Sequence, residues 1–247
     1  MLINDAAASD GFFGKFNLVI KEQETDLGSN RLCGQELTIN EGVDNVKIGF
    51  EPLAETVAKY VVNIGAAKDR SLIWSQDIAN TESSIDLPKS VFGSEKTLVA
   101  IEAYYRLEEA LTSACLFPPQ TFQVAEPVTS LASDQLAQAN GIEFLVDSLT
   151  NGEFADPIYF EAFGTRTIQL DLPADSDVTT VVLHNLKVKA AGNLTLYGTI
   201  EGSEAVELGT FPEQRFMVID LGKANNVDGV QLTFGSGLVD LQEISVH

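Results

Sequence analysis

The stretch Gly229–His247, GVQLTFGSGLVDLQEISVH, decides the fold of the second half of this chain. Its first part places Val230, Leu232 and Phe234 at every second position, with polar residues between them. This alternation is typical of a β-strand that buries one face. Similar strand patterns fill most of the residues before it, so the stretch predicts a β-fold.

The same stretch also contains a conflict of phase. Val239 and Leu241 share one parity, whereas Ile244 and Val246 share the other. Either a bulge shifts the phase, or Glu243 points inward. An inward carboxylate is costly unless a cation or hydrogen-bond donors meet it. A feature of this kind favours a binding role over catalysis.

Composition limits the classes of partner. The chain has 247 residues, and 45% of them are hydrophobic, which is ordinary for a globular protein. Its 36 acidic and 15 basic residues give a formal net charge of −21. Such a surface repels phosphate backbones and anionic lipid. We therefore expect no nucleic-acid partner.

The sequence also bears on the compartment. Met1–Asp5 lacks the basic start of a secretory signal, and the apolar runs are too short to span a bilayer. We expect synthesis in a host cytoplasm and no membrane insertion. Cys33 and Cys115 form neither a metal-ligand cluster nor a disulfide framework. A single bridge is one option, and two separate buried thiols are the favoured one in a reducing cytoplasm.

Patterning divides the chain into an N-terminal arm, residues 1–35, and two domains, residues 36–127 and 128–247. Prolines at 118, 119 and 127 punctuate the boundary, because proline removes a donor and stiffens the chain. Residues 133–140, SDQLAQAN, predict a short capped helix or a linker.

Short alternating strands recur through the first domain, at the spacing of a β-sandwich. Three of them, VKIGFEP (46–52), AKYVVNI (58–64) and TLVAIEA (97–103), resemble the second, third and sixth strands of a fibronectin type III module. Phe50 stands where a Trp is common. The corner tyrosine of that family is missing, because its position falls at Thr97. Other immunoglobulin-like sandwiches stay open.

The second domain shows about eight short strands with glycine-rich turns, which suits a jelly-roll sandwich. Its order of segments resembles the discoidin, or coagulation-factor C-type, family of the galactose-binding-like superfamily. The resemblance rests on SLTNGEF (148–154), TIQLDLP (167–173), NLTLYGTIEG (193–202), RFMVIDLG (215–222) and LQEISVH (241–247). The predicted fold class is therefore all-β, with two tandem β-sandwiches.

The resemblance implies a structural calcium ion, held in that family by the early loop and by the glutamate before the last strand. Carried over, the ligands would be Asn151, Glu153 and Glu243, with Asp156 as a spare carboxylate. Oxygen ligands suit Ca²⁺. The alternative is that Asn151 and Gly152 form only a hairpin turn and that Glu243 is exposed or bulged.

Sugar-binding members of the family present aromatic platforms from loops. Tyr159, Phe160 and Phe163 flank the candidate metal loop, with Arg166 nearby, and they are candidates for stacking on a sugar ring. Core packing or a protein interface is the favoured interpretation. The single tryptophan, Trp74, lies in the first domain instead.

Catalytic motifs are absent from the sequence. There is neither a Gly-x-Ser-x-Gly elbow nor a phosphate-cradling Gly-Lys-Ser loop, and only two histidines are present. His184 reads as a structural histidine on an apolar strand, and His247 as a solvated one. A glycosidase needs only two carboxylates, so that chemistry is not excluded, but nothing favours it. We expect no enzymatic activity.

Adhesion-type modules made in a cytoplasm without an export signal resemble bacteriophage structural proteins. This resemblance implies a virion protein of a tail, baseplate or adsorption apparatus, with other virion proteins as partners in an oligomeric assembly. Two alternatives are a capsid-decorating (cement) protein and a carbohydrate-binding module that recognises a host surface glycan.

Overall fold

The computed structural model divides into two compact units, residues 1–127 and residues 128–247. It describes residues 31–33, 35–53, 57–68, 70–107, 110–133, 135–140, 142–143, 149–152, 154, 160–163, 166–188, 192–235 and 238–247. Residues 1–30 and 34 of the predicted arm lie outside this set. No helix of the described residues is long and apolar enough to cross a membrane.

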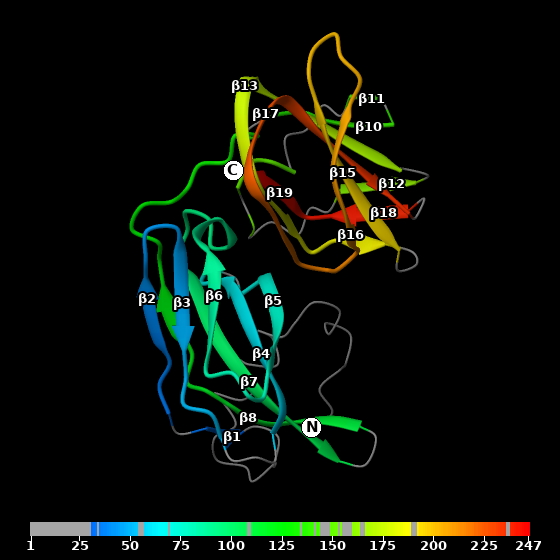
Figure 1. Ribbon diagram of the computed structural model, residues 1–247. Helices are drawn as coiled ribbons and strands as arrows, with labels where there is room; N and C mark the ends of the chain where they lie inside the picture. Colours follow the sequence, from blue (N-terminus) through cyan, green and yellow to red (C-terminus); the bar gives the residue numbers. More distant parts are fainter. Residues whose placement is uncertain are drawn as a thin grey trace. The chain divides into compact units, whose positions relative to one another are not determined.

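Strands form almost all of the regular structure in the described residues (Figure 1), which confirms the predicted all-β fold. The described part of the chain has only a three-residue 3-10 helix, η2 (Lys89–Val91), besides strands and turns. Residues 133–140 contain strand β10 (Ala137–Ala139), so the predicted helix there is wrong. Ala137 and Ala139 are buried and Gln138 is not, which is the period of a strand.

The first unit contains two sheets. The smaller has the order β2-β3-β6: β2 (Thr38–Glu41), β3 (Asn45–Gly49) and β6 (Ser84–Pro88). The larger has the order β1-β8-β7-β4-β5, with β9 against β7: β1 (Arg31–Leu32), β4 (Val57–Ala66), β5 (Leu72–Ala79), β7 (Thr97–Leu107), β8 (Ala110–Leu116) and β9 (Gln120–Phe122). The three stretches that resemble fibronectin type III strands coincide with β3, β4 and β7, and the family assignment stays a prediction.

Alternating apolar residues supply the core of the first unit. Ile48 of β3 and Ile64 of β4 are fully buried. The ring of Phe50 packs edge-on against Tyr60 and Phe117, with centroids 4.7 Å and 5.4 Å apart. Trp74 is 1% exposed, so the single tryptophan of the chain is a core residue and not a stacking platform.

The two cysteines form a disulfide, so the favoured prediction of separate thiols is wrong. β1 runs parallel to β8, with Arg31 opposite Cys115 and with the Cys33 amide bonded to the Leu116 carbonyl at 2.9 Å. This pairing brings the Cα atoms of Cys33 and Cys115 to 5.2 Å, within the range of a disulfide. The bridge joins residues 82 positions apart and ties the β1 segment to the larger sheet.

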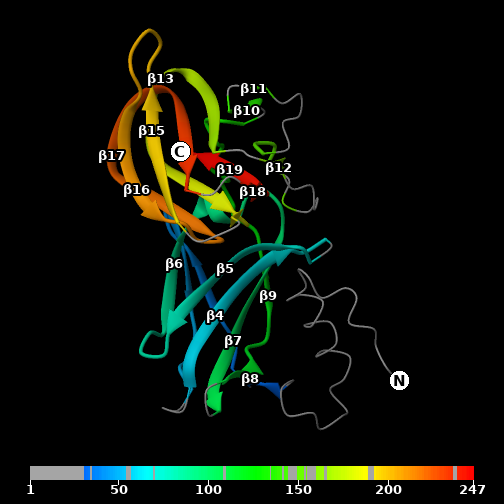
Figure 2. The same ribbon diagram turned by 90° about the vertical axis from the view of Figure 1, so that its right-hand side faces the viewer.

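The second unit also contains two sheets (Figures 1 and 2). The larger has the order β11-β10-β13-β17-β15-β16, with β19 against β13: β11 (Ile142–Glu143), β13 (Thr167–His184), β15 (Asn193–Thr199), β16 (Val206–Pro212), β17 (Met217–Phe234) and β19 (Glu243–Val246). The smaller has the order β12-β18-β14: β12 (Phe160–Phe163), β14 (Lys187–Val188) and β18 (Leu238–Leu241).

Two long strands, β13 and β17, organise the larger sheet. They pair antiparallel along their lengths, with irregularities in register between Asp171 and Ser176 and between Val178 and Thr180 of β13. Irregularities of this kind bend a strand and increase its twist. On the edge of β13 that faces away from β17, residues 168–170 pair with β10 and the last four residues pair with β19.

The phase conflict in the last stretch arises because the chain passes from one sheet to the other between β18 and β19. β18 belongs to the smaller sheet and β19 to the larger, and Gln242 lies between them. Every residue of β19 is buried, and Glu243 is 2% exposed. The inward Glu243 is thus confirmed, and the crossing between sheets takes the place of the alternative bulge.

Candidate functional site

The predicted metal loop and the last strand meet in the structure. Gly152 has φ +72°, and its amide donates a hydrogen bond to Glu243 Oε1 at 3.0 Å. The Ile244 amide bonds to the Leu149 carbonyl at 2.7 Å, which holds the loop against β19. Glu243 therefore lies beside Gly152, the residue that follows Asn151. The discoidin resemblance implies that this loop and Glu243 lie close together.

The described residues supply only part of a calcium site. Glu153 and Asp156 lie outside them, and no group of three or more His, Cys, Asp or Glu side chains gathers anywhere in the described part. Glu243 already accepts an N–H donor, which stabilises its charge without a cation. Asn151 and Glu243 are the described oxygen donors, and the calcium ion stays a prediction.

A buried hydrogen-bond network surrounds this loop. Gln242 Nε2 donates to the Phe154 carbonyl at 2.8 Å, and its Oε1 accepts from Asn185 Nδ2 at 3.4 Å. Asn185 Oδ1 in turn accepts from Arg215 Nε at 2.6 Å. Gln242 and Asn185 are 3% and 1% exposed, so these bonds satisfy groups that water cannot reach. The network connects Phe154, the turn after β13 and the turn before β17.

The histidines have structural positions. His184 is fully buried, and its ring packs against Phe154 with centroids 4.5 Å apart. His247 is half-buried, contrary to the predicted solvated position. Burial lowers the pKa of His247 to about 4, so its imidazole is neutral at pH 7.

The side chains of the predicted aromatic platform lie outside the part of the chain that the structure describes. Tyr159 is not among the described residues, and Phe160 and Phe163 are described only as the ends of β12. Arg166 is exposed, and its amide donates to Asn140 Oδ1 at 3.0 Å. Stacking by these side chains remains a prediction.

The outward face of the larger sheet of the second unit is a different kind of site, and the sequence analysis does not identify it. Inward residues of its strands, such as Ile168, Leu196 and Leu232, are fully buried in the core. Their neighbours in sequence point to the other face and are polar. Figures 1 and 2 both show β13, β17, β15 and β16 side by side.

Register aligns the outward side chains into two rows that cross the strands. The first, here called the amide row, has the partners Gln138–Gln169–Gln231–Tyr197 on β10, β13, β17 and β15, with Glu207 of β16 at its end. The second, the threonine row, has the partners Thr167–Thr233–Thr195–Thr210 on β13, β17, β15 and β16. Glu207 and Thr210 are exposed and the other members are half-exposed.

Hydrogen bonds within the face hold several of these groups in place. Gln169 Nε2 donates to Asp171 Oδ1 at 3.1 Å. The hydroxyls of Thr195 and Thr210 are 2.9 Å apart, and Thr210 donates to Glu207 Oε1 at 3.1 Å. Neither row contains a lysine or an arginine. Acidic residues stand at both ends of the amide row, with Glu143 of β11 opposite Gln138 and Glu207 of β16 opposite Tyr197. Asp171 lies two residues beyond Gln169 on β13.

Gly229 of β17 marks the end of the part of the sheet that carries the two rows. A Cβ added to Gly229 would lie 2.5 Å from Thr199 Oγ1 and 2.7 Å from the Leu170 carbonyl oxygen, so no larger residue fits. Beyond it, Asp228 accepts the amides of Glu201 at 2.9 Å and Asp175 at 3.0 Å, and these bonds hold the pKa of Asp228 below its usual value.

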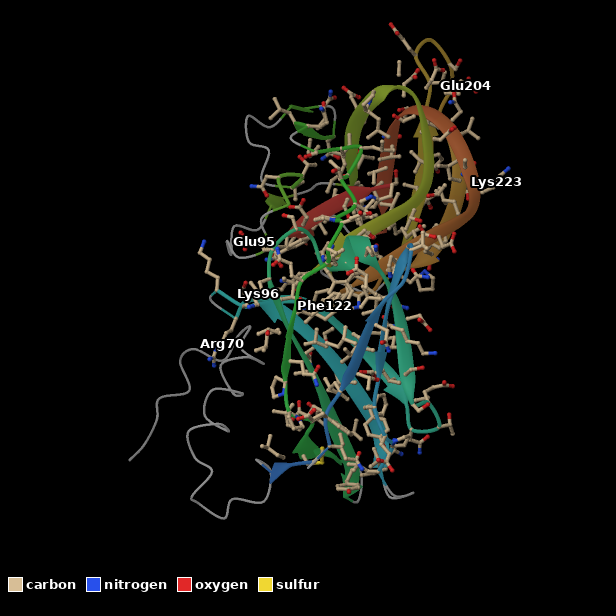
Figure 3. All side chains as sticks on the ribbon, turned by 90° about the vertical axis from the view of Figure 1, so that its left-hand side faces the viewer. Arg70, Glu95, Lys96, Phe122, Glu204 and Lys223 are labelled. Atoms are coloured by element: carbon tan, nitrogen blue, oxygen red, sulfur yellow. A yellow bond between two sulfur atoms is a disulfide. The ribbon has the colours of Figure 1, made fainter. Side chains whose placement is uncertain are left out.

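The segments beyond this end of the patterned rows carry charge. Figure 3 shows Glu204, in the turn after β15, and Lys223, within β17, extending from the unit. Both residues are exposed. Apart from Glu207, the two rows consist of uncharged side chains and thus differ in composition from these neighbouring segments.

No family model matches this chain, and no curated protein matches it significantly. Solved structures similar to about half of it include CpGH89CBM32-6 of Clostridium perfringens, at 14% identity and TM-score 0.40, covering 48% of this chain and 98% of that one. Another is chitosan-binding module 1 from a chitosanase/glucanase of Paenibacillus sp. IK-5, at 20% identity and TM-score 0.39, covering 48% and 98%. A third is CBM32-1 from a family 31 glycoside hydrolase of C. perfringens, at 12% identity and TM-score 0.40, covering 49% and 99%.

Proposed function

We propose that the second unit is a non-catalytic carbohydrate-binding module whose binding surface is the outward face of its larger sheet. The observation that carries the proposal is the pair of aligned rows, one of amides ending in Tyr197 and one of hydroxyls. Of the functions that the sequence predicts, glycan binding is the one that this face supports.

The chemistry of the rows suits sugars. Glutamine amides and threonine hydroxyls both donate and accept hydrogen bonds, as sugar hydroxyls require from a partner. Tyr197 adds a rigid ring with an apolar face at the end of the amide row. Side chains of this kind bind neutral polar molecules without burying a charge, which keeps the desolvation penalty low.

Asp171 and Glu207, two carboxylates of this face, are placed poorly for joint action in hydrolysis. Asp171 lies on β13 and Glu207 on β16, three strands apart in the sheet order. Strands lie about 4.8 Å apart, which puts these residues roughly 14 Å from each other. Paired carboxylates of glycosidases lie within about 9.5 Å. This separation favours binding over glycoside cleavage.

The experiment is a binding screen of the full chain against uncharged glycans on an array, followed by titration calorimetry of the hits. Tyr197→Ala should weaken binding by tenfold or more, and Tyr197→Phe should retain most of it because the ring remains. Gln214→Ala, an exposed glutamine in the turn between β16 and β17, is the matched control and should bind normally. A chain that binds no glycan, or that binds equally well without Tyr197, would contradict the proposal.

The virion setting remains a prediction of its own. Glycan recognition fits an adsorption protein that contacts a host surface, and other virion proteins would then be partners. Peptide mass fingerprinting of purified particles tests this. A tail or adsorption protein would be present at low copy number, whereas a cement protein would match the capsid protein in stoichiometry.

A further inference from the structure

Both rows run across the strands of the larger sheet. Each crosses the strands instead of following one of them, because its members are register partners on neighbouring strands. From Gln138 to Tyr197 the amide row covers three strand spacings, which is about 14 Å. The threonine row runs beside it, two residues away on β13, β17 and β15, at a distance of about 7 Å.

This arrangement selects a ligand longer than it is wide. One sugar ring can contact one or two neighbouring strands, because strands lie about 4.8 Å apart. Reaching from Tyr197 of β15 to Gln138 of β10 needs several rings joined in an extended chain. A ribbon-like polysaccharide carries hydroxyls along both of its long edges, and the two rows offer partners for both edges.

The charges on and around the face restrict the class of polysaccharide further. Neither row contains a cationic residue, and acidic residues stand at both ends of the amide row, Glu143 opposite Gln138 and Glu207 opposite Tyr197. The whole chain has a net charge of −21. A polymer of uronic acids or sulfated sugars would be repelled by this field. An uncharged polymer would not.

We propose that the face binds an internal segment of an extended, uncharged polysaccharide laid across β10, β13, β17 and β15. This inference rests on the proposed glycan binding and specifies its substrate class. Affinity then accumulates ring by ring along the rows, since a single aromatic residue supplies only one stacking platform.

The experiment measures how the affinity of the full chain depends on ligand length. The probes are ladders of one to six rings of β-1,4-linked glucose, mannose, xylose and N-acetylglucosamine, titrated by calorimetry, with polygalacturonate as the anionic polymer. For the ladder that binds, affinity should rise at least tenfold from one ring to four, and polygalacturonate should not bind.

The outcomes separate the two proposals. Equal affinity for one ring and for four would overturn the extended-ribbon inference and leave glycan binding intact. No binding to any glycan on the array or in the ladders would overturn both. Strong binding of polygalacturonate would overturn the assignment to an uncharged polymer.

A variant tests the direction of the ribbon. Gln138 lies on β10, three strands from Tyr197. Gln138→Ala should weaken binding of a four-ring ligand threefold or more and leave binding of a one-ring ligand unchanged. The matched control is Gln214→Ala, with the melting temperature of each variant as the check on folding. Equal loss for short and long ligands, or no loss for either, would contradict a chain that crosses the strands.

Discussion

At the scale of single residues, buried polar side chains fix the local structure of the second unit. Gln242 lies at the point where the chain leaves the smaller sheet for the larger one, and no water reaches its amide. Its two hydrogen bonds, to Phe154 and Asn185, connect segments 88 and 57 positions away in sequence. The residue therefore fixes both the crossing and the loop that faces Glu243.

Gln242→Ala should destabilise the second unit by about 1–3 kcal/mol, because it leaves the Phe154 carbonyl and the Asn185 amide without these bonds inside the protein. Chemical denaturation followed by far-UV circular dichroism measures the change. Gln214→Ala removes the same atoms from an exposed glutamine and should change stability by less than about 0.5 kcal/mol. Equal effects of the two variants would contradict the structural role of Gln242.

The strands themselves follow from the sequence at the scale of elements. Alternation predicts the buried faces of β3, β7, β13 and β17, because period two is a local property of the chain. The pairing of β1 with β8 is not local, since it joins residues more than eighty positions apart, and the disulfide depends on it. The prediction of separate thiols fails for that reason.

The disulfide should stabilise the first unit. Closing a loop of this length in the unfolded chain is worth about 4.5 kcal/mol on a chain-entropy estimate. The fluorescence of Trp74 follows the first unit alone, because it is the single tryptophan of the chain and is buried there. Reduction, or Cys33→Ser with Cys115→Ser, should shift the Trp74 unfolding transition to lower denaturant concentration. An unchanged transition would show that the bridge does not form or does not constrain the unit.

The predicted calcium ion concerns the loop at 149–152 and strand β19. If the ion binds there, a chelator should lower the melting temperature of the second unit and leave the Trp74 transition of the first unit unchanged. Calorimetry with and without EDTA measures both units in one sample. Identical melting curves would remove the metal from the account and leave the loop held by hydrogen bonds such as Gly152–Glu243 and Ile244–Leu149.

The binding rows show where sequence reasoning stops. The polar residues of TIQLDLP and NLTLYGT are visible in the sequence as the outward half of each alternation. Their alignment across the sheet is not visible, because it depends on the register between β13, β17 and β15. The inward Glu243 is one of two alternatives that follow from a phase conflict within one short stretch. The discoidin resemblance brings the Asn151 loop close to Glu243, but the bond from the Gly152 amide is visible only in the structure.

The chain joins two β-sandwich units, each with its own core, at the scale of the whole molecule. Its acidic composition disfavours anionic partners, and the two rows differ from it because, apart from Glu207, their side chains are uncharged. A rigid sheet face binds with little ordering of the protein, so the loss of conformational entropy on binding is small. The central claim is that this face is the binding surface for an extended glycan.

The most direct measurement of this claim is mapping by NMR on the ¹⁵N-labelled full chain, titrated with the tightest oligosaccharide of the ladders. We predict that the amides that shift most belong to β10, β13, β17 and β15 around Gln138, Gln169, Gln231 and Tyr197, together with the side-chain amides of the three glutamines. Shifts confined to other parts of the chain, such as the loop at 149–154 or the first unit, would contradict the claim even if the glycan binds.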